Sequence, residues 1–155
     1  MKNVTKTESR AESCGHAFGV GLPTSPRAVR GQETRAQRDA GALVDRMFRA
    51  FSDRTRLRIL HLLQDGELCV GDLVGILQVP QPRASRHLAY LRKADLVVVR
   101  KSGLWSYYSL TPAKTPFHRN LLKCLATCFR EVPEIQADQA RALGVRKSGG
   151  CCPSS

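Results

Sequence analysis

The chain has 155 residues, of which 42% are hydrophobic and 25% are charged, a balance typical of one globular domain with room for tails. No apolar run approaches the ~20 residues that a membrane span needs. The charged N-terminus also lacks the apolar segment of a secretory signal. We therefore expect a cytoplasmic protein with no membrane partner.

The charge balance points to a polyanionic partner. The chain contains 25 Lys and Arg residues against 13 Asp and Glu, which gives a formal net charge of +12 and a pI near 10.1. A chain with this excess of positive charge favours polyanions, with nucleic acid first and anionic membrane surfaces second, and composition alone does not choose between the two. The excess is concentrated in residues 80–101, which hold six basic side chains and a single acid, Asp95, whereas residues 39–79 are close to neutral.

Composition and periodicity divide the chain into three regions. Residues 1–38 are rich in Ser, Thr, Gly, Pro and Arg and lack periodicity, so we expect a disordered basic arm. Residues 39–132 carry the periodic segments of a folded domain. Residues 133–155 contain a helix at about 134–143 and a Gly-rich tail.

The folded region predicts a regular order of elements. Apolar residues at helical spacing predict helices over about 39–51, 53–64, 71–78, 82–94 and 117–131. Ser52-Asp53 supplies the N-cap signal for the second helix, and a short extended segment precedes the third. Strands over 96–100 and 105–110 flank a turn that contains Gly103, so they form a hairpin.

This order of elements predicts a winged helix-turn-helix, in which two helices joined by a short turn are followed by a basic hairpin. The fold class is mainly α with a small β-hairpin (α+β). Ala84, Leu88 and Leu91 face the core, and the opposite helix face suits a DNA major groove. The hairpin suits phosphate or a minor groove. The alternative is a basic helix that merely faces water. The candidate DNA-binding residues are Gln81, Arg83, Ser85, Arg86, His87, Tyr90, Lys93, Arg100 and Lys101.

Three motifs, in order, resemble the ArsR/SmtB metalloregulatory repressors over about residues 40–132. Residues 51–60 are similar to the family's A-x-x-D-P-T-R-x-x-I-L stretch, without its Pro. Residues 67–73 resemble the E-L-C-V-C-D-L metalloid box, and residues 81–88 resemble the Q-P-x-x-S-R-H-L start of the recognition helix. The resemblance implies a homodimer on double-stranded operator DNA, joined through the first and last helices of the domain. It also implies release from DNA when a metal or metalloid binds.

The six cysteines predict a soft-ion site. Without an export signal they are expected to be thiols or metal ligands rather than disulfides. Cys69 precedes a helix, whose positive end favours the thiolate. Gly71 stands where the arsenic-sensing branch has a second Cys, and Gly is a tolerable N-cap for the helix that follows. One sulfur cannot hold trivalent arsenic, which the family binds through three.

The tail can supply the missing sulfurs, because Cys151 and Cys152 are adjacent and follow a Gly-rich linker. The predicted ligands are therefore Cys69, Cys151 and Cys152, with As(III) or Sb(III) as inducer and no catalytic cofactor. Two alternatives remain open: Cys69 as a buried apolar residue, and tail cysteines without a role.

The other cysteines rank lower as ligands. Cys124 and Cys128 share the apolar face of the last domain helix, which favours packing in the core or between subunits. Either of them, or Cys14, remains an alternative third ligand, and His118 is a weaker candidate for a zinc site. Residues 124–130 match the C-x₅-R pattern of a phosphate-binding loop, but they contain no Gly and lie in a helix, so we expect no enzyme.

Two other functions fit the same fold. One is a repressor that responds to thiol oxidation or to another metal, and the other is a DNA-binding protein without a small-molecule input.

Overall fold

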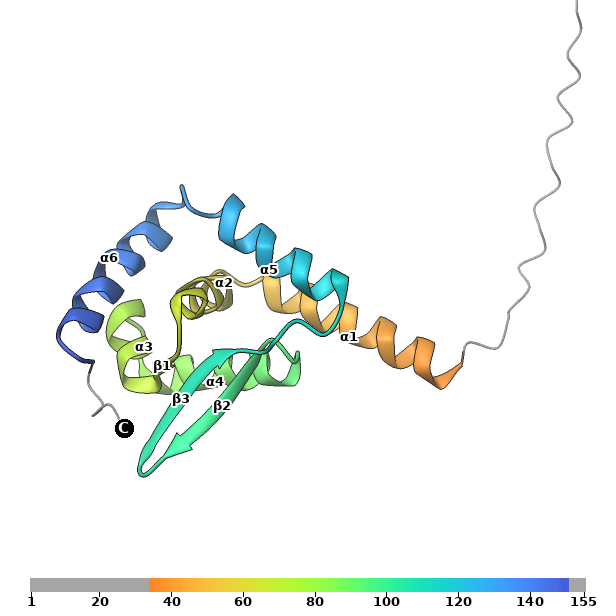
Figure 1. Ribbon diagram of the computed structural model, residues 1–155, viewed down its shortest axis with the longest axis horizontal. Helices are drawn as coiled ribbons and strands as arrows, with labels where there is room; N and C mark the ends of the chain where they lie inside the picture. Colours follow the sequence, from red (N-terminus) through yellow and green to blue (C-terminus); the bar gives the residue numbers. More distant parts are fainter. Residues whose placement is uncertain (1–33, 151–155) are drawn as a thin grey trace, which may run out of the picture. The chain divides into compact units, whose positions relative to one another are not determined.

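Six α-helices and a small antiparallel sheet make up residues 34–150, the part of the chain that the computed structural model describes (Figure 1). The helices are α1 (Arg35–Phe51), α2 (Arg54–Leu62), α3 (Val70–Leu77), α4 (Gln81–Lys93), α5 (Pro116–Cys128) and α6 (Pro133–Lys147). A 3₁₀ turn, η1 (Leu63–Asp65), follows α2, and the strands are β1 (Leu68–Cys69), β2 (Val97–Ser102) and β3 (Trp105–Leu110). Most of the predicted arm, with Cys14, and the tail cysteines lie outside the described residues.

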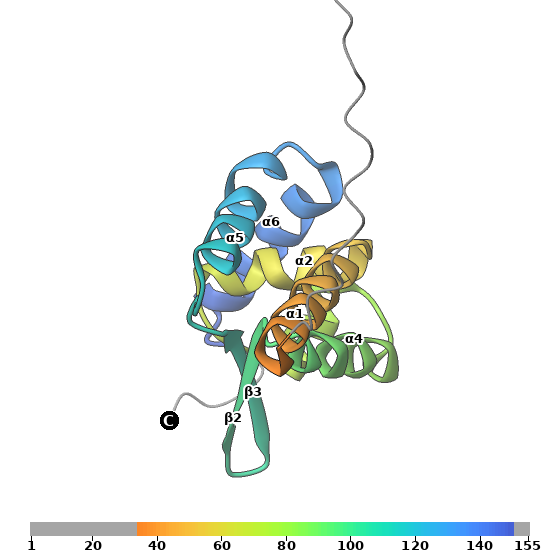
Figure 2. The ribbon, with the colours of Figure 1, turned by 90° about the vertical axis from the view of Figure 1, so that its right-hand side faces the viewer.

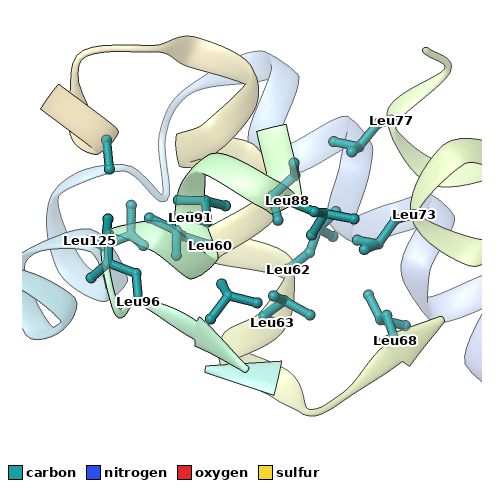
Figure 3. Close-up of a cluster of buried hydrophobic side chains, with 14 of the residues drawn as sticks. Leu60, Leu62, Leu63, Leu68, Leu73, Leu77, Leu88, Leu91, Leu96 and Leu125 are labelled. Carbon is teal, nitrogen blue, oxygen red and sulfur yellow. The ribbon is translucent and has the colours of Figure 1, made fainter. Parts of the chain in front are cut away.

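The core is a cluster of leucines that α2, α4 and the sheet share (Figure 3). Leu60 on α2, Leu88 and Leu91 on α4, and Leu96 just before β2 are all completely buried. The predicted inward positions of α4, Ala84 among them, are thereby confirmed. Burial of each such side chain contributes about 1.5–3 kcal/mol, so this cluster fixes α4 against α2. None of the helices in residues 34–150 is long and apolar enough to span a membrane.

Side-chain caps set the starts of the first two helices. Thr34 and Gln37 form a reciprocal capping box: the Thr34 hydroxyl accepts from the Gln37 amide, and the Gln37 side chain accepts from the Thr34 amide. Helix α1 therefore begins before the predicted residue 39, inside the segment expected to be a disordered arm. Asp53 caps α2 by accepting from the Arg56 amide at 2.9 Å, as its sequence position predicts.

The sheet has three strands in the order β1-β3-β2, one more than the predicted hairpin. Strands β2 and β3 are joined by a tight turn in which Gly103 has a φ of +56°, a conformation that glycine adopts without strain. The hairpin projects from the helices (Figures 1 and 2). Strand β1 pairs with the other edge of β3, so Cys69 lies opposite Tyr107, and Tyr107 lies opposite Arg100 of β2.

Helix α6 packs against α2 and α3 and so belongs to the same folded unit as these helices. Its anchor is Asp138, which is 1% exposed. The carboxylate accepts hydrogen bonds from Arg58 of α2 at 2.5 and 2.7 Å and from Arg141 at 2.6 Å. The hydrogen bonding of Arg58 to Asp138 raises the pKa of Arg58, so its guanidinium group stays charged.

The same two arginines also hold the end of α3. Arg58 donates to the Leu77 carbonyl at 3.1 Å, and Arg141 donates to the Ile76 carbonyl at 2.6 Å. These carbonyls belong to the last turn of a helix, where backbone acceptors lack helical partners. One buried carboxylate therefore ties α6 to both α2 and α3.

We predict that Asp138→Asn lowers the free energy of unfolding by about 3–5 kcal/mol, because it leaves two partly buried guanidinium groups without their counter-charge. The matched control is Glu134→Gln, which removes the exposed ion pair between the same two helices, Glu134 to Arg54. That pair should contribute at most about 1 kcal/mol. Urea unfolding followed by circular dichroism measures both variants, and equal losses would contradict the assignment of Asp138 as the anchor.

Candidate functional site

The turn between α3 and α4 sets the direction of α4. Gln78 ends α3 in the left-handed conformation, with a φ of +55°. Pro80 precedes the first residue of α4, and Pro82 lies within its first turn, where a missing amide proton does no harm. The two helices pack directly on one another, which is the arrangement of a helix-turn-helix.

The outward face of α4 is polar and basic. Among the candidate DNA-binding residues of α4 the exposed ones are Gln81, Arg83, Ser85, Arg86 and Lys93. Within residues 34–150 no acidic side chain forms an ion pair with Arg83, Arg86 or Lys93, so the face presents uncompensated positive charge to solvent. Such a surface suits a duplex, where arginine reads guanine edges and lysine contacts phosphate.

Two other candidates on α4 turn back toward α2. The His87 ring lies 3.5 Å from the carboxylate of Asp53, the residue that caps α2. Burial lowers the pKa of His87 more than Asp53 raises it, so the ring is neutral at pH 7. The Tyr90 ring lies under the Arg56 guanidinium, 4.4 Å from its centroid. Both side chains therefore brace α4 against α2, and DNA contact through them remains a prediction.

The hairpin places its basic residues differently. Lys101 is exposed near the tip. Arg100 bonds to Glu67 at 2.5 Å and stacks on Tyr107 at 4.7 Å, and the bond to Glu67 raises the pKa of Arg100. Glu67 directly precedes β1, so its ion pair with Arg100 links β2 to the start of β1. In the sheet register, Arg100 pairs with Tyr107, which pairs with Cys69.

Cys69 performs a structural task that the sequence did not reveal. Its sulfur accepts a hydrogen bond from the amide of Asp72 at 3.3 Å and so caps α3. The thiol also donates to the Asp72 carboxylate at 3.3 Å. The N-cap is therefore Cys69 and not Gly71, which lies inside the first turn. The side chain is completely buried.

A pocket opens beside this thiol. Its lining includes Cys69, Asp72, Arg100 and Tyr107, and also Gly149 and Gly150 at the end of α6. Both glycines have positive φ values, +84° and +74°, which turn the chain after the helix. A β-carbon on Gly150 would lie 3.0 Å from an Asp72 carboxylate oxygen, so only glycine fits here without a shift.

The described residues do not complete a metal site by themselves. Within residues 34–150 no three His, Cys, Asp or Glu side chains come together as ligands. The predicted partners of Cys69, namely Cys151 and Cys152, lie outside the described residues. Gly150 directly precedes Cys151 in the sequence, so the described chain ends at the pocket where a second and third sulfur are predicted.

The remaining sulfur pair, Cys124 and Cys128, does not pack in the core of the chain, and packing between subunits stays a prediction. Cys124 and Cys128 are both exposed, so the expectation of core packing is wrong for the single chain. Their α5 face looks outward because Leu125, between them, takes the buried position. His118 is only 1% exposed, and burial lowers the pKa of its ring, so it faces the interior of the domain.

Comparison with known proteins supports a regulatory role. The family described as "Bacterial regulatory protein, arsR family" matches residues 53–99, which run from the cap of α2 into β2. The chain is 49% identical over 67 residues to the Arsenical resistance operon repressor of Escherichia coli K12. The match covers 43% of this chain and 57% of that protein. It is 45% identical over 101 residues to the Arsenic resistance transcriptional regulator ArsR1 of Pseudomonas putida, covering 64% of this chain and 79% of that one.

The solved structures agree on the fold. The homodimeric winged helix-turn-helix DNA-binding domain of Mb0332 from Mycobacterium bovis superposes with a TM-score of 0.53 at 23% identity, over 71% of this chain and 92% of that one. The predicted winged helix-turn-helix is thus confirmed. All these relatives are regulators, which agrees with the expectation that the chain is not an enzyme.

Proposed function

The chain belongs to the ArsR family of bacterial regulatory proteins, and on this premise we propose that it is a homodimeric repressor with a thiol-based inducer site. The repressor binds operator DNA through α4 and the β2–β3 hairpin. It leaves the operator when trivalent arsenic or antimony binds Cys69, Cys151 and Cys152. The observation that carries the proposal is the pocket at Cys69, which the wing and the end of α6 both line.

DNA binding rests on the exposed basic face of α4 and on Lys101 of the hairpin. Two copies of the domain related by two-fold symmetry would place their α4 helices in successive major grooves, about 10–10.5 base pairs apart. Since the contacts are largely between basic side chains and phosphates, affinity should fall steeply as salt rises. The expected operator is therefore a two-fold symmetric duplex.

The dimer interface follows from the apolar face that α1 and α5 share. Phe48 of α1 is 55% exposed although its ring packs on Phe117 of α5, with centroids 5.3 Å apart. A large aromatic ring left half in water is costly for a single chain. A second copy docked on this face would cover Phe48, in keeping with the homodimer implied by the family resemblance.

The inducer site needs sulfur from the tail. Cys69 is the one thiol that lines the pocket among the described residues. Consecutive Cα atoms are about 3.8 Å apart, and Cys151 directly follows Gly150, which lines the pocket together with Asp72. Three thiolates suit a soft, thiophilic ion and disfavour Mg²⁺, Ca²⁺ and Mn²⁺. Each thiol exchanges its proton for a bond to arsenic, and the proton leaves with a hydroxyl group of arsenous acid as water.

Two connections link this thiol to the DNA-binding surface. Through its sulfur, Cys69 caps α3, which packs on α4. Through its backbone, Cys69 pairs with Tyr107, which pairs with Arg100 of the wing. A sulfur that gives up the Asp72 amide to bind an ion disturbs the first connection directly, and Cys69 is also the residue through which the second one runs. A coupling of about 3–5 kcal/mol between the two sites would empty the operator.

Arg86→Ala should weaken operator binding by about 10- to 100-fold, because a bidentate contact to guanine contributes about 1–3 kcal/mol. The probe is a duplex that the full chain itself selects from random-sequence DNA, and fluorescence anisotropy measures the affinity. Arg130→Ala is the matched control. It removes the same charge from an exposed side chain in the segment that joins α5 to α6, away from α4 in both views (Figures 1 and 2). Equal losses for the two variants would contradict docking through α4.

The inducer site is tested by Cys69→Ser and by the double variant Cys151→Ser with Cys152→Ser. Both should stay on the duplex at arsenite concentrations that release the unaltered chain. Serine is a good N-cap, so Cys69→Ser keeps the hydrogen bond that starts α3 and removes only the thiol chemistry. The control is Cys124→Ser with Cys128→Ser, which should respond normally to arsenite.

The responses of these variants to arsenite and to an oxidant distinguish the competing inducer signals. Normal release of the tail variant, together with loss of release in the control, would transfer the site to α5 and contradict the proposed ligands. Release by the thiol oxidant diamide but not by arsenite would identify a redox repressor instead. An affinity that neither reagent changes would identify a DNA-binding protein without this input.

A further inference from the structure

The apex of the β2–β3 hairpin is apolar, in contrast to the basic residues Arg100 and Lys101 just before it. Leu104 is 99% exposed, more than any other large hydrophobic side chain within residues 34–150, and its neighbour Trp105 is 38% exposed. The hairpin projects from the helices in both views, so this apolar surface lies away from the core (Figures 1 and 2). The proposed contacts of the wing with DNA use basic side chains and leave Leu104 without a role.

Local turn chemistry does not account for this leucine. Ser102 pairs with Trp105, so Gly103 and Leu104 are the two central residues of the turn. Gly103 has a φ of +56° and Leu104 does not have a positive φ, as in a type II′ turn with glycine first. Turns favour Gly, Asn, Asp and Ser because these residues tolerate a positive φ or bond to nearby backbone. Leucine does neither, and its exposed side chain gains no packing energy from the described chain.

The stem of the hairpin holds this apex in place. Strand β1 pairs with β3 at Tyr107, which lies opposite Cys69, and the last part of the hairpin extends beyond β1 to the turn. Arg100, which pairs with Tyr107, bonds to Glu67 at 2.5 Å and stacks on the Tyr107 ring at 4.7 Å. Leu104 is therefore presented at the end of a short, braced hairpin, and little conformational entropy is lost when a partner receives it.

The partner that fits this apex is the minor groove of DNA. Lys101 is exposed on the same hairpin, and the chain has a formal net charge of +12, so phosphates are attracted to it. Leucine is one of the apolar side chains that minor-groove proteins insert between base pairs. Insertion would bury Leu104, and this burial offsets part of the cost of unstacking the bases.

We propose that Leu104 is a wedge, which the wing inserts from the minor groove between two stacked base pairs of the operator. The inference rests on the proposed function, because it needs the hairpin docked on DNA. An inserted wedge of this kind kinks the duplex by roughly 20–90° toward the major groove. Pyrimidine–purine steps, namely TA and CA/TG, unstack most easily. The operator should therefore contain such a step at a fixed distance from the bases that α4 contacts, once on each side of the two-fold axis.

Selection from random-sequence DNA tests the wedge, with the full chain and its Leu104→Ala variant compared side by side. The unaltered chain should enrich a flexible step at that fixed position. Leu104→Ala should lose this enrichment while it still selects the bases that α4 contacts. Its affinity for the duplex that the unaltered chain selects should fall about 10-fold, because the burial of a leucine side chain is lost. Since Leu104 is exposed, the substitution should leave the fold intact.

Two matched variants separate the wedge from a general loss of apolar surface. Leu104→Met keeps a side chain that minor-groove proteins also insert, so it should retain both the enrichment and the affinity. Leu143→Ala removes the same side chain from an exposed position on α6, a helix that lies apart from the apex in both views (Figures 1 and 2). This variant should behave like the unaltered chain.

The fluorescent base 2-aminopurine, placed at the selected step, reports the unstacking directly because its emission is quenched while it is stacked. Binding of the unaltered chain should raise the emission, and binding of Leu104→Ala should not. Emission that stays quenched under the unaltered chain, or unchanged selection and affinity in Leu104→Ala, would overturn the wedge and leave the apex to a protein partner. Operator binding that still depends on Arg86 would then preserve the proposed function. A chain that selects no duplex at all would overturn both.

Discussion

The hydrogen bond from the Asp72 amide to the sulfur of Cys69 is the constraint on which the proposed mechanism depends. A helix start needs an acceptor for its free amide groups, and serine, threonine, aspartate or asparagine usually supplies it. Here a thiol does so, and it is completely buried. The same atom therefore stabilises α3 and is the predicted soft ligand. An ion that binds the sulfur competes with the Asp72 amide at the start of α3, the helix that precedes α4.

The position of α6 gives that sulfur its neighbours. Asp138 holds α6 on α2 and α3 through Arg58 and Arg141. Just past the end of the helix, Gly149 and Gly150 line the same pocket as Asp72. Without this anchor the predicted tail ligands would be tethered at a distance set only by chain length. With it, the chain enters the tail next to the thiol, and the loss of chain entropy on closing the site is small.

Local sequence signals predicted much of this architecture. The apolar spacing of α2 to α4, the Asp53 cap and the Gly103 turn each depend on residues close in sequence, so they were readable. The Thr34 and Gln37 capping box was equally local, and its pattern of Thr followed by Gln three residues on was a usable signal for the start of α1.

Long-range features could not be read in this way. The pairing of β1 with β3 involves a strand of two residues, too short to show alternation. The bonds from Asp138 to Arg58 span eighty positions. The exposure of Cys124 and Cys128 depends on which part of α5 covers the core, and a helical wheel shows only that these residues share a side. The same limit applied to His87, whose position on the wheel did not reveal that Asp53 lies beside it.

The central claim, that chemistry at Cys69 reaches the wing, is tested most directly by the fluorescence of Trp105, the only tryptophan in the chain. Trp105 begins β3, the strand that also carries Tyr107, and it is 38% exposed. Arsenite added to the DNA-free chain should shift its emission and saturate at one equivalent per chain, with no shift in Cys69→Ser. Stoichiometric arsenite binding that leaves the emission unchanged, or an equal shift in Cys69→Ser, would contradict the account.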